Sequence, residues 1–467
     1  MALPDLIEIV PLDKPVRAEI TVPGSKSITN RALILAALAD GEVTLTGTLW
    51  SEDTQIMAEC LQKLGFEIRV EPDPEEFCNR TITVKGLGGK IPNAGTAEKP
   101  LELFVGNAGT AARFLSAFVC LGNGVYRLSG VSRMHERPQA ALFQALRELG
   151  YRVESEKGND KLPVKIFGEG PKKGKCRVSI EESSQFASAL LLCAKIGNWK
   201  IEIVGENAEE SPYVAMTLKL IEAFQKNGGT FRIEPDASSG SYFWAAGVPE
   251  HSGPIVYRTV IEQESFSKST VSHVEFSVRV SNWPFSSKWQ IDAEFPTLIP
   301  ILFDLGENLR VSYASNARWS APRISRKSDI GDSIMIAIML APLAFCPLQF
   351  IDLGRLRVQE CERVAALRTE LTKCGAKVVE EGDTLTVSPS PLHGAEIETY
   401  NDHRMAMCFA ILGLKVPGIK IKNPACVKKT FPNFFQKLAA PPPQGLGATI
   451  LDAKTGRKLE LDELFAD

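Results

Sequence analysis

Lysine and arginine side chains stand beside polar helix starts at several points along the chain. The clearest case is Pro23–Arg31, where a Pro-Gly pair ends an alternating strand and an apolar helix follows. The free N–H groups of a first helical turn, next to Lys26 and Arg31, form a binding site for an anion with several oxygens. The alternative is an ordinary helix, capped by Ser25 or Ser27, that carries two solvated cations.

Four further cations occur in comparable settings across the rest of the chain. They are Arg137, Arg363, Arg404 and Lys429. Taken singly, each is explained by a solvated charge or by a structural ion pair. Together with Lys26 and Arg31 they predict a pocket for ligands that carry several phosphate and carboxylate groups, because these anions form strong charge-assisted hydrogen bonds with arginine and lysine.

Two alternating motifs would position these side chains. The first is an amphipathic helix, then a glycine that ends the helix in the left-handed conformation, then a strand. Its glycines recur every 69 to 85 residues, at Gly65, Gly150, Gly228, Gly306 and Gly375. Residues 434–439 look like a sixth, shortened copy. Such a period indicates a fold built from repeated α/β units.

The second motif is a short polar segment followed by an almost entirely apolar helix of small residues. It begins near Ser27, Asn107–Thr110, Ser183–Gln185, Asp236–Ser239, Asp332–Ser333 and Asn401–Arg404. Helices that are apolar on every face are expected to be buried, so their polar starts would open into shared clefts. The two motifs together predict six α/β units, three in each of two domains.

Composition limits the function classes. The chain has 467 residues and a net charge of −3, with 44% apolar and 23% charged residues. This length indicates two or more domains, and the charge gives no general field for nucleic acid. The ten cysteines form no C-x-x-C pair, and there are only five histidines, so a metal centre is not expected. Scattered cysteines, without a leader pattern or an apolar run that could span a membrane, favour a cytoplasmic protein.

Seven segments in the same order resemble the EPSP synthase family of enolpyruvyl transferases over about residues 20–438. They are 23–31, 106–113, 133–138, 183–186, 236–239, 400–407 and 429–432. The resemblance implies a two-domain inside-out α/β barrel with six βαβαββ repeats. Residues 22–234 would form the domain with the shikimate-phosphate site, and residues 1–21 with 235–440 the second domain. Residues 441–467 are expected to be a linker and a tail, the latter an edge strand or a docking peptide.

The resemblance also implies an activity. The enolpyruvyl group would pass from phosphoenolpyruvate to the 5-hydroxyl of shikimate 3-phosphate through a tetrahedral intermediate, with release of phosphate and without a metal or organic cofactor. These two small molecules would be the partners of a monomer that binds neither nucleic acid nor membrane.

By the same resemblance, Asp332 looks like the base for the 5-hydroxyl and Glu360 like the group that handles the methylene proton, with Lys26 and Lys429 completing the catalytic set. The shikimate 3-phosphate contacts would be Lys26, Ser27, Arg31, Ser183, Ser184, Gln185, Tyr213, Asp332, Arg355 and Gln359. The phosphoenolpyruvate contacts would be Lys26, Asn107, Gly109, Thr110, Arg137, Gln185, Arg363, His403, Arg404 and Lys429.

The chain departs from the family pattern at several positions. Gln359 stands where the family has a substrate-contacting lysine, and Arg355 stands where it has asparagine. We hypothesise that Arg355 restores the missing cation, since positions four apart share a face if the segment is helical. Glu210 replaces a common serine, and Phe114 replaces a proline, which puts sensitivity to the phosphoenolpyruvate mimic glyphosate in doubt. A long aromatic stretch at 249–289 is expected to add a hairpin.

Two other functions fit parts of the pattern. UDP-N-acetylglucosamine enolpyruvyl transferase shares this fold and chemistry, but it usually carries a catalytic cysteine shortly before an Arg-Pro pair. The corresponding segment here, 133–138, contains none. A ligand-binding relative without catalysis is supported only by the departures at Glu210, Arg355 and Gln359.

Overall fold

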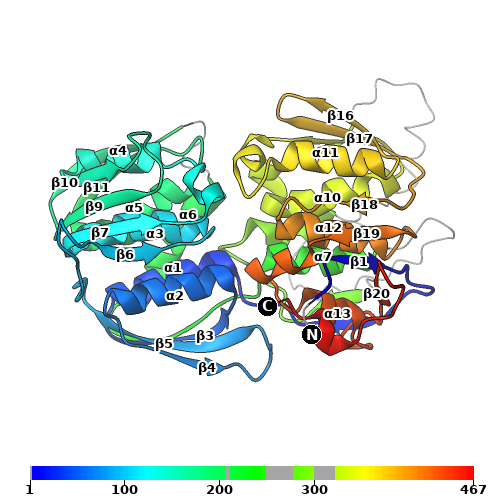
Figure 1. Cartoon of the computed structure of the whole chain (residues 1–467), viewed down its shortest axis with the longest axis horizontal. Coiled ribbons are helices and arrows are strands. Elements are labelled where there is room, and N and C mark those ends of the chain that lie inside the picture. The colour runs from blue at the N-terminus through cyan, green and yellow to red at the C-terminus, as the bar shows by residue number, and fades with distance from the viewer. Residues whose placement is uncertain (1–2, 206–210, 249–276, 299–320, 467) are drawn as a thin grey trace, which may run out of the picture.

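The computed structural model describes residues 3–205, 211–248, 277–298 and 321–466. Two separate hydrophobic cores divide it into the two lobes of Figure 1. The core of the first lobe takes its side chains from residues 28–233. The core of the second lobe takes them from residues 3–22 and 237–466. The chain therefore passes between the lobes twice, and both termini lie at the second lobe.

Six sheets are found in the described ranges, three in each lobe. Those of the first lobe are, in strand order, β12 (Gly229–Arg232), β3 (Asp40–Leu49), β5 (Asn79–Leu87) and β4 (Ile68–Pro72); β6 (Leu101–Phe104), β7 (Asn123–Ser129), β9 (Val164–Glu169) and β8 (Arg152–Ser155); and β10 (Gly174–Ser179) with β11 (Trp199–Val204). Those of the second lobe are β14 (Arg323–Ser325), β15 (Leu348–Ile351), β17 (Thr384–Ser388) and β16 (Lys377–Glu381); β18 (Glu396–Ile397), β19 (Ile419–Lys422), β1 (Leu6–Ile9) and β20 (Ile450–Asp452); and β13 (Val278–Val280) with β2 (Ala18–Ile20).

Every four-stranded sheet repeats one pairing pattern. Its first two strands are parallel, as in β12 with β3 or β14 with β15, and the two following pairs are antiparallel. The sheets that begin with β6 and β18 are built in the same way. Recurrence of this pattern in both lobes confirms the predicted two-domain α/β fold.

Six helices fill the cores, and each begins at one of the predicted polar segments. They are α1 (Lys26–Leu38), α3 (Gly109–Phe118), α5 (Gln185–Gly197), α7 (Ala237–Ala246), α10 (Ile334–Leu340) and α12 (His403–Gly413). All residues of α3 and α10 are buried. α3, α5, α10 and α12 each connect the two parallel strands of one sheet. Helices without a polar face are stable only inside a core, which explains why the chain buries them.

Five further α-helices are found in the described ranges. They are α2 (Glu52–Lys63), α4 (Ala140–Glu148), α6 (Pro212–Ala223), α11 (Arg363–Lys373) and α13 (Phe434–Ala439). The glycines predicted to follow them, Gly65, Gly150, Gly228 and Gly375, have φ between +86° and +96°, as helix ends of this kind require. Gly306 lies outside the described residues.

The two passages between the lobes run side by side. Ser25 donates its backbone N–H to the Glu234 carbonyl at 2.8 Å, and Asp236 donates its own to the Pro23 carbonyl at 2.8 Å. A Cβ at Gly24 would collide with the backbone carbonyl of Gly47, so only glycine allows this close approach. The paired passages place the start of α1, and with it Lys26, at the boundary between the lobes.

Residues 441–467, which were expected to form a linker and a tail, fold back onto the second lobe. Gly445 donates its backbone N–H to the Pro441 carbonyl, which turns the chain back onto the second lobe. β20 then pairs with β1, and apolar residues including Leu446 and Leu464 are buried in the second core. The alternating segment near the end forms a 3₁₀ helix, Leu461–Leu464, and not a strand. These residues complete a core rather than extend from it.

Other predictions concern burial and the aromatic stretch. All ten cysteines are buried and unpaired, and none of the helices in the described ranges is long and apolar enough to cross a membrane.

The hairpin expected at 249–289 falls largely outside the described residues. Of its described part, Trp283 packs edge-on against Trp244 at 5.7 Å within the second core.

Candidate active site

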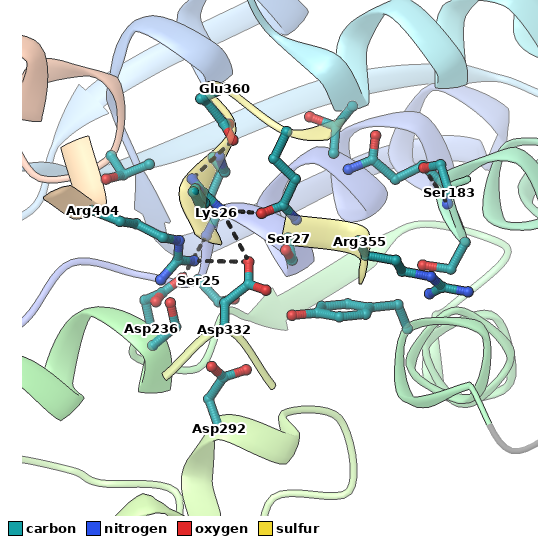
Figure 2. A pocket seen from close by; sticks show the side chains of 18 of the residues that line it. Ser25, Lys26, Ser27, Ser183, Asp236, Asp292, Asp332, Arg355, Glu360 and Arg404 are labelled. Atoms are coloured by element: carbon teal, nitrogen blue, oxygen red, sulfur yellow. Dashed lines mark hydrogen bonds and ion pairs between the residues drawn. The ribbon is translucent and has the colours of Figure 1, made fainter. Parts of the chain in front are cut away.

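Most of the predicted site residues line one pocket between the lobes (Figure 2). Those found there are Lys26, Ser27, Arg31, Thr110, Arg137, Ser183, Ser184, Gln185, Tyr213, Asp332, Arg355, Gln359, Glu360, Arg363, His403 and Arg404. They come from the first turns of α1, α3, α5, α6, α11 and α12, from the turns before α4 and α10, and from the 3₁₀ helix Gly354–Val358 with the two residues after it. The predicted cations therefore gather in one place, although they are far apart along the chain.

Asp332 lies in the turn before α10 and is surrounded by three guanidinium groups. Arg326 donates to its Oδ1 from Nη2 at 2.5 Å and from Nε at 3.2 Å. Arg404 and Arg363 approach Oδ2 at 3.4 and 3.9 Å. Burial by itself would raise the pKa of Asp332, but these cations hold that pKa well below its usual range. The carboxylate is therefore ionised at neutral pH and able to accept a proton.

Glu360 lies at the end of the pocket opposite to Asp292 in Figure 2. Its Oε1 lies 3.0 Å from Nζ of Lys429, and its Oε2 lies 2.8 Å from Nη2 of Arg363. Arg363 also contacts Asp402, with Nε 2.7 Å from Oδ2. Burial would raise the pKa of Glu360, but Lys429 and Arg363 hold it well below its usual range. Two cations and two carboxylates thus form one buried network.

Four other arginines at the pocket have no carboxylate partner within the described part of the chain. They are Arg31, Arg113, Arg137 and Arg355. Arg31 is 1% exposed and donates only to neutral oxygens of Ser27, Ser188 and Thr217, at 2.8 to 3.1 Å. Burial lowers its pKa to about 10. An enclosed guanidinium without a counter-ion is costly, and the cost disappears when an anion binds.

Asn107, Gly109 and Lys429 border the pocket without lining it. The backbone carbonyl of Asn107 accepts hydrogen bonds from Arg137 Nη1 at 3.1 Å and from Lys429 Nζ at 3.3 Å. Asn107 therefore acts through its backbone, and its buried Oδ1 has no hydrogen-bond partner among the described residues. A Cβ at Gly109 would press on the guanidinium groups of Arg113 and Arg137, so glycine leaves room for both.

Arg355 and Gln359 do not share a helix face in the way that was hypothesised. Arg355 lies in a 3₁₀ helix, Gly354–Val358, and Gln359 follows it, so a spacing of four does not align them. Both nevertheless line the pocket. Arg355 donates to the Ile180 carbonyl of the other lobe at 2.6 Å, and Gln359 accepts a hydrogen bond from Arg363. Glu210 lies outside the described residues.

The remaining predicted residues differ in their charge and packing. His403 opens α12 and is 1% exposed, and neither ring nitrogen has a hydrogen-bond partner among the described residues. Burial and the charge of Lys26 lower its pKa well below the usual value, so the imidazole is neutral. Phe114 is buried beneath Arg31, whose Cζ lies 5.2 Å from the ring centroid. No group of three or more His, Cys, Asp or Glu in the described ranges could hold a metal ion.

A family model described as EPSP synthase (3-phosphoshikimate 1-carboxyvinyltransferase) matches residues 11–258 and 276–438. The chain belongs to the EPSP synthase family. It is 35% identical over 466 residues to a 3-phosphoshikimate 1-carboxyvinyltransferase of Trichormus variabilis, covering 93% of this chain and 98% of that protein. It is 37% identical over 451 residues to the protein of the same name from Opitutus terrae, covering 94% of this chain and 98% of that protein.

Solved structures show that the fold is shared with other members of the EPSP synthase family and beyond. The EPSP synthase of Acinetobacter baumannii superposes with a TM-score of 0.63 at 20% identity, over 95% of this chain and 99% of that one. The enolpyruvyl transferase NikO of Streptomyces tendae superposes with a TM-score of 0.58 at 14% identity, over 98% and 99%. At these identities the likeness concerns the fold alone.

The sequence prediction missed several residues that line the pocket of this EPSP synthase family member. They include Arg113, Asp236, Gln290, Asp292 and Arg326. Arg113 and Asp236 belong to segments that carried the resemblance, so a signal for them was present. Asp236 was noted only as a helix start, but its Oδ2 accepts the backbone N–H of Lys26 at 3.2 Å and so caps α1. Ser25 makes no side-chain capping bond. Arg326 and Asp292 had no such signal.

Asp292 is a buried carboxyl group beneath Asp332 (Figure 2). Its Oδ1 accepts hydrogen bonds from the backbone N–H and the hydroxyl of Ser333, at 2.8 and 2.9 Å. Burial and repulsion by Asp332 raise its pKa from 3.8 to about 7. Between pH 3.8 and about pH 7, the folded chain holds a proton on Asp292 that the unfolded chain has lost. This group therefore makes the protein less stable as the pH rises through that window.

Asp292→Asn is expected to remove this pH-dependent loss of stability, because asparagine does not ionise. Its Oδ1 can still accept the hydrogen bonds from Ser333. Relative to the wild type, the free energy of unfolding of the variant should rise by on the order of 4 kcal/mol between pH 4 and pH 7, or about 1.4 for each of three pH units. Urea unfolding at several pH values measures this difference. Glu294→Gln, at an exposed position nearby, is the control. Parallel pH profiles for Asp292→Asn and the wild type would contradict the assignment.

Proposed function

We propose that the chain transfers the enolpyruvyl group of phosphoenolpyruvate to the 5-hydroxyl of shikimate 3-phosphate, giving 5-enolpyruvylshikimate 3-phosphate and phosphate. One observation carries the proposal. Two buried, ionised carboxylates, Asp332 and Glu360, lie in a pocket whose other walls hold arginines that have no carboxylate partner in the part of the chain that the structure describes. Such a pocket suits two polyanionic substrates that exchange protons as they react. The relatives named 3-phosphoshikimate 1-carboxyvinyltransferase supply the identity of those substrates.

The two substrates would occupy different parts of the pocket. Shikimate 3-phosphate would bind near Arg31, Ser183, Ser184 and Arg355, where hydroxyl groups meet guanidinium groups that have no carboxylate partner among the described residues. Its acceptor hydroxyl would lie at Asp332. Phosphoenolpyruvate would bind at the network around Glu360, held by Arg137, Arg363, Arg404 and Lys429. Lys26, at the boundary between the lobes, would touch both substrates.

The chemistry follows from these positions. Asp332 accepts the 5-hydroxyl proton as that oxygen attacks C2 of phosphoenolpyruvate, and C3 gains a proton from the Lys429–Glu360 pair, whose Nζ and Oε1 are 3.0 Å apart. The tetrahedral adduct then loses a proton from C3 to the same pair. The C2–O bond to phosphate breaks and phosphate leaves. The surrounding arginines stabilise the negative charge throughout. No step requires a metal or an organic cofactor.

Phosphate release on mixing the purified protein with shikimate 3-phosphate and phosphoenolpyruvate tests this proposal. We expect release that requires both compounds. UDP-N-acetylglucosamine in place of shikimate 3-phosphate should give none, since 133–138 lacks the cysteine of that sister enzyme. Release only with the UDP-sugar would assign the chain to the sister enzyme, and no release with either acceptor would identify a binding protein. A cytoplasmic location and a monomeric state stay predictions.

A further inference from the structure

Arg326 differs from the other cations around Asp332 in the number of its partners. Arg363 also contacts Asp402 and Glu360. Arg326 is 7% exposed and has Asp332 as its single carboxylate partner among the described residues. It occupies Oδ1 of Asp332 with two hydrogen bonds. An oxygen engaged in this way is poorly placed to accept a proton from a substrate, so Oδ1 becomes available as a base only when this ion pair loosens.

The surroundings of Arg326 show where its guanidinium group could go. Arg326, Arg355 and Tyr213 line the main pocket and also a second cavity between the lobes. This side cavity includes Ser211, which is 2% exposed and whose hydroxyl has no hydrogen-bond partner in the described part of the chain. Burial, followed by repulsion from Arg326, lowers the pKa of Arg355 to about 10. Two guanidinium groups thus meet at the junction of the cavities, and of the two only Arg326 forms an ion pair with a carboxylate in the described ranges.

We propose that Arg326 couples acceptor binding to the release of Asp332. An anionic group of the acceptor, bound at the junction between Arg326 and Arg355, takes over the Arg326 guanidinium and leaves Oδ1 of Asp332 free to receive the hydroxyl proton. Without an anionic acceptor, Arg326 keeps the base neutralised. This inference rests on the proposed function, since it concerns the acceptor of the same reaction. It makes Arg326 a specificity-determining residue for acceptors that carry a phosphate or a carboxylate.

The basicity of Asp332 depends on every charged group that faces it. Besides Arg326 these are Arg363 from α11, Arg404 from α12, Arg355, Asp292 and the Tyr213 hydroxyl. The cations favour the ionised form, whereas Asp292 opposes it. Loss of Arg326 removes one of the favouring charges, so the pKa of Asp332 rises. The acid limb of the pH dependence of kcat/KM for the acceptor, which reports the free enzyme, should then move to higher pH.

The test compares Arg326→Gln and Arg326→Lys with Arg323→Gln, an exposed position on β14 outside both cavities. Titration calorimetry without phosphoenolpyruvate measures the Kd of shikimate 3-phosphate, and steady-state phosphate release measures both KM values and the pH profile. We expect Arg326→Gln to raise the Kd and KM of the acceptor about ten- to hundredfold. The KM of phosphoenolpyruvate should stay within about twofold, and the acid limb should move upward. Arg326→Lys, which keeps the charge but loses the fork of donors, should be intermediate, and Arg323→Gln should match the wild type.

The outcomes separate this inference from the proposed function. If the wild type binds shikimate 3-phosphate and releases phosphate while Arg326→Gln keeps the wild-type acceptor Kd and acid limb, the inference alone is overturned. An equal rise in both KM values would indicate a general structural defect and would also overturn it. If Arg326→Gln does not fold, Arg326→Lys decides by the same criteria. If the wild type neither binds the acceptor nor turns it over, the proposed function fails first.

Discussion

Asp332→Asn is expected to lower kcat for phosphate release by on the order of 10³, because general base catalysis contributes about 10² to 10⁴ to a rate. Asparagine has the same shape, and its Oδ1 can still accept hydrogen bonds from Arg326. It cannot take the hydroxyl proton, however, because an amide oxygen is a far weaker base than the carboxylate, which three guanidinium groups keep ionised. Steady-state phosphate release at saturating substrate concentrations measures the effect.

Asp329→Asn is the matched control for this variant. Asp329 lies three residues before Asp332, and its carboxylate accepts the backbone N–H of Ser325 at 2.7 Å without lining the pocket. This substitution should leave kcat within about twofold, because asparagine can still accept the Ser325 N–H and Asp329 does not line the pocket. Calorimetry should show that Asp332→Asn still binds both substrates. A kcat for Asp332→Asn above a third of the wild-type value would mean that another group accepts the proton.

Arg363→Leu is expected to lower the free energy of unfolding by about 3 to 5 kcal/mol, because removing one partner leaves buried charges without compensation. Arg363 is 1% exposed and lies 2.7 Å from Asp402 and 2.8 Å from Glu360. Leucine would leave both carboxylates facing an apolar side chain. The folded-state pKa of Glu360, which Arg363 helps to hold low, would rise, so the deficit should shrink as the pH falls and this carboxylate becomes protonated.

Arg368→Leu, on the same helix, provides the comparison. Arg368 pairs with Glu380 at 2.8 Å, but its side chain is 47% exposed, and exposed pairs contribute only about 0 to 1 kcal/mol. Chemical unfolding of both variants at pH 7 and pH 5 measures the difference. Equal losses of stability for Arg363→Leu and Arg368→Leu would show that the buried network does not depend on Arg363.

The sequence predicted the repeated units well, because their signals are local. An all-apolar helix has to be buried, and a glycine after an amphipathic helix ends it in the same conformation wherever it occurs. Four of the five predicted glycines have the expected positive φ, and the fifth lies outside the described residues. All six polar segments begin core helices. Ordered motifs were sufficient for the family, since each preserves a local pattern of residues.

Predictions that depended on long-range packing were less successful. The segment 441–467 has a linker-like start, and only its pairing with β1 and its burial in the second core reveal a structural role. The spacing of Arg355 and Gln359 suggested a shared helix face, but the segment forms a 3₁₀ helix. Local propensity cannot foresee these outcomes, because tertiary contacts decide them.

By itself the sequence determined which helices are buried, where their polar ends lie and which cations accompany those ends. Only the tertiary structure decided that Arg326 takes Oδ1 of Asp332, that Asp292 lies beneath it and that Arg31 has no carboxylate beside it in the described ranges. The reason is physical. Charges interact through space with a strength set by distance and burial, and neither quantity can be read from positions along a chain that passes twice between two lobes.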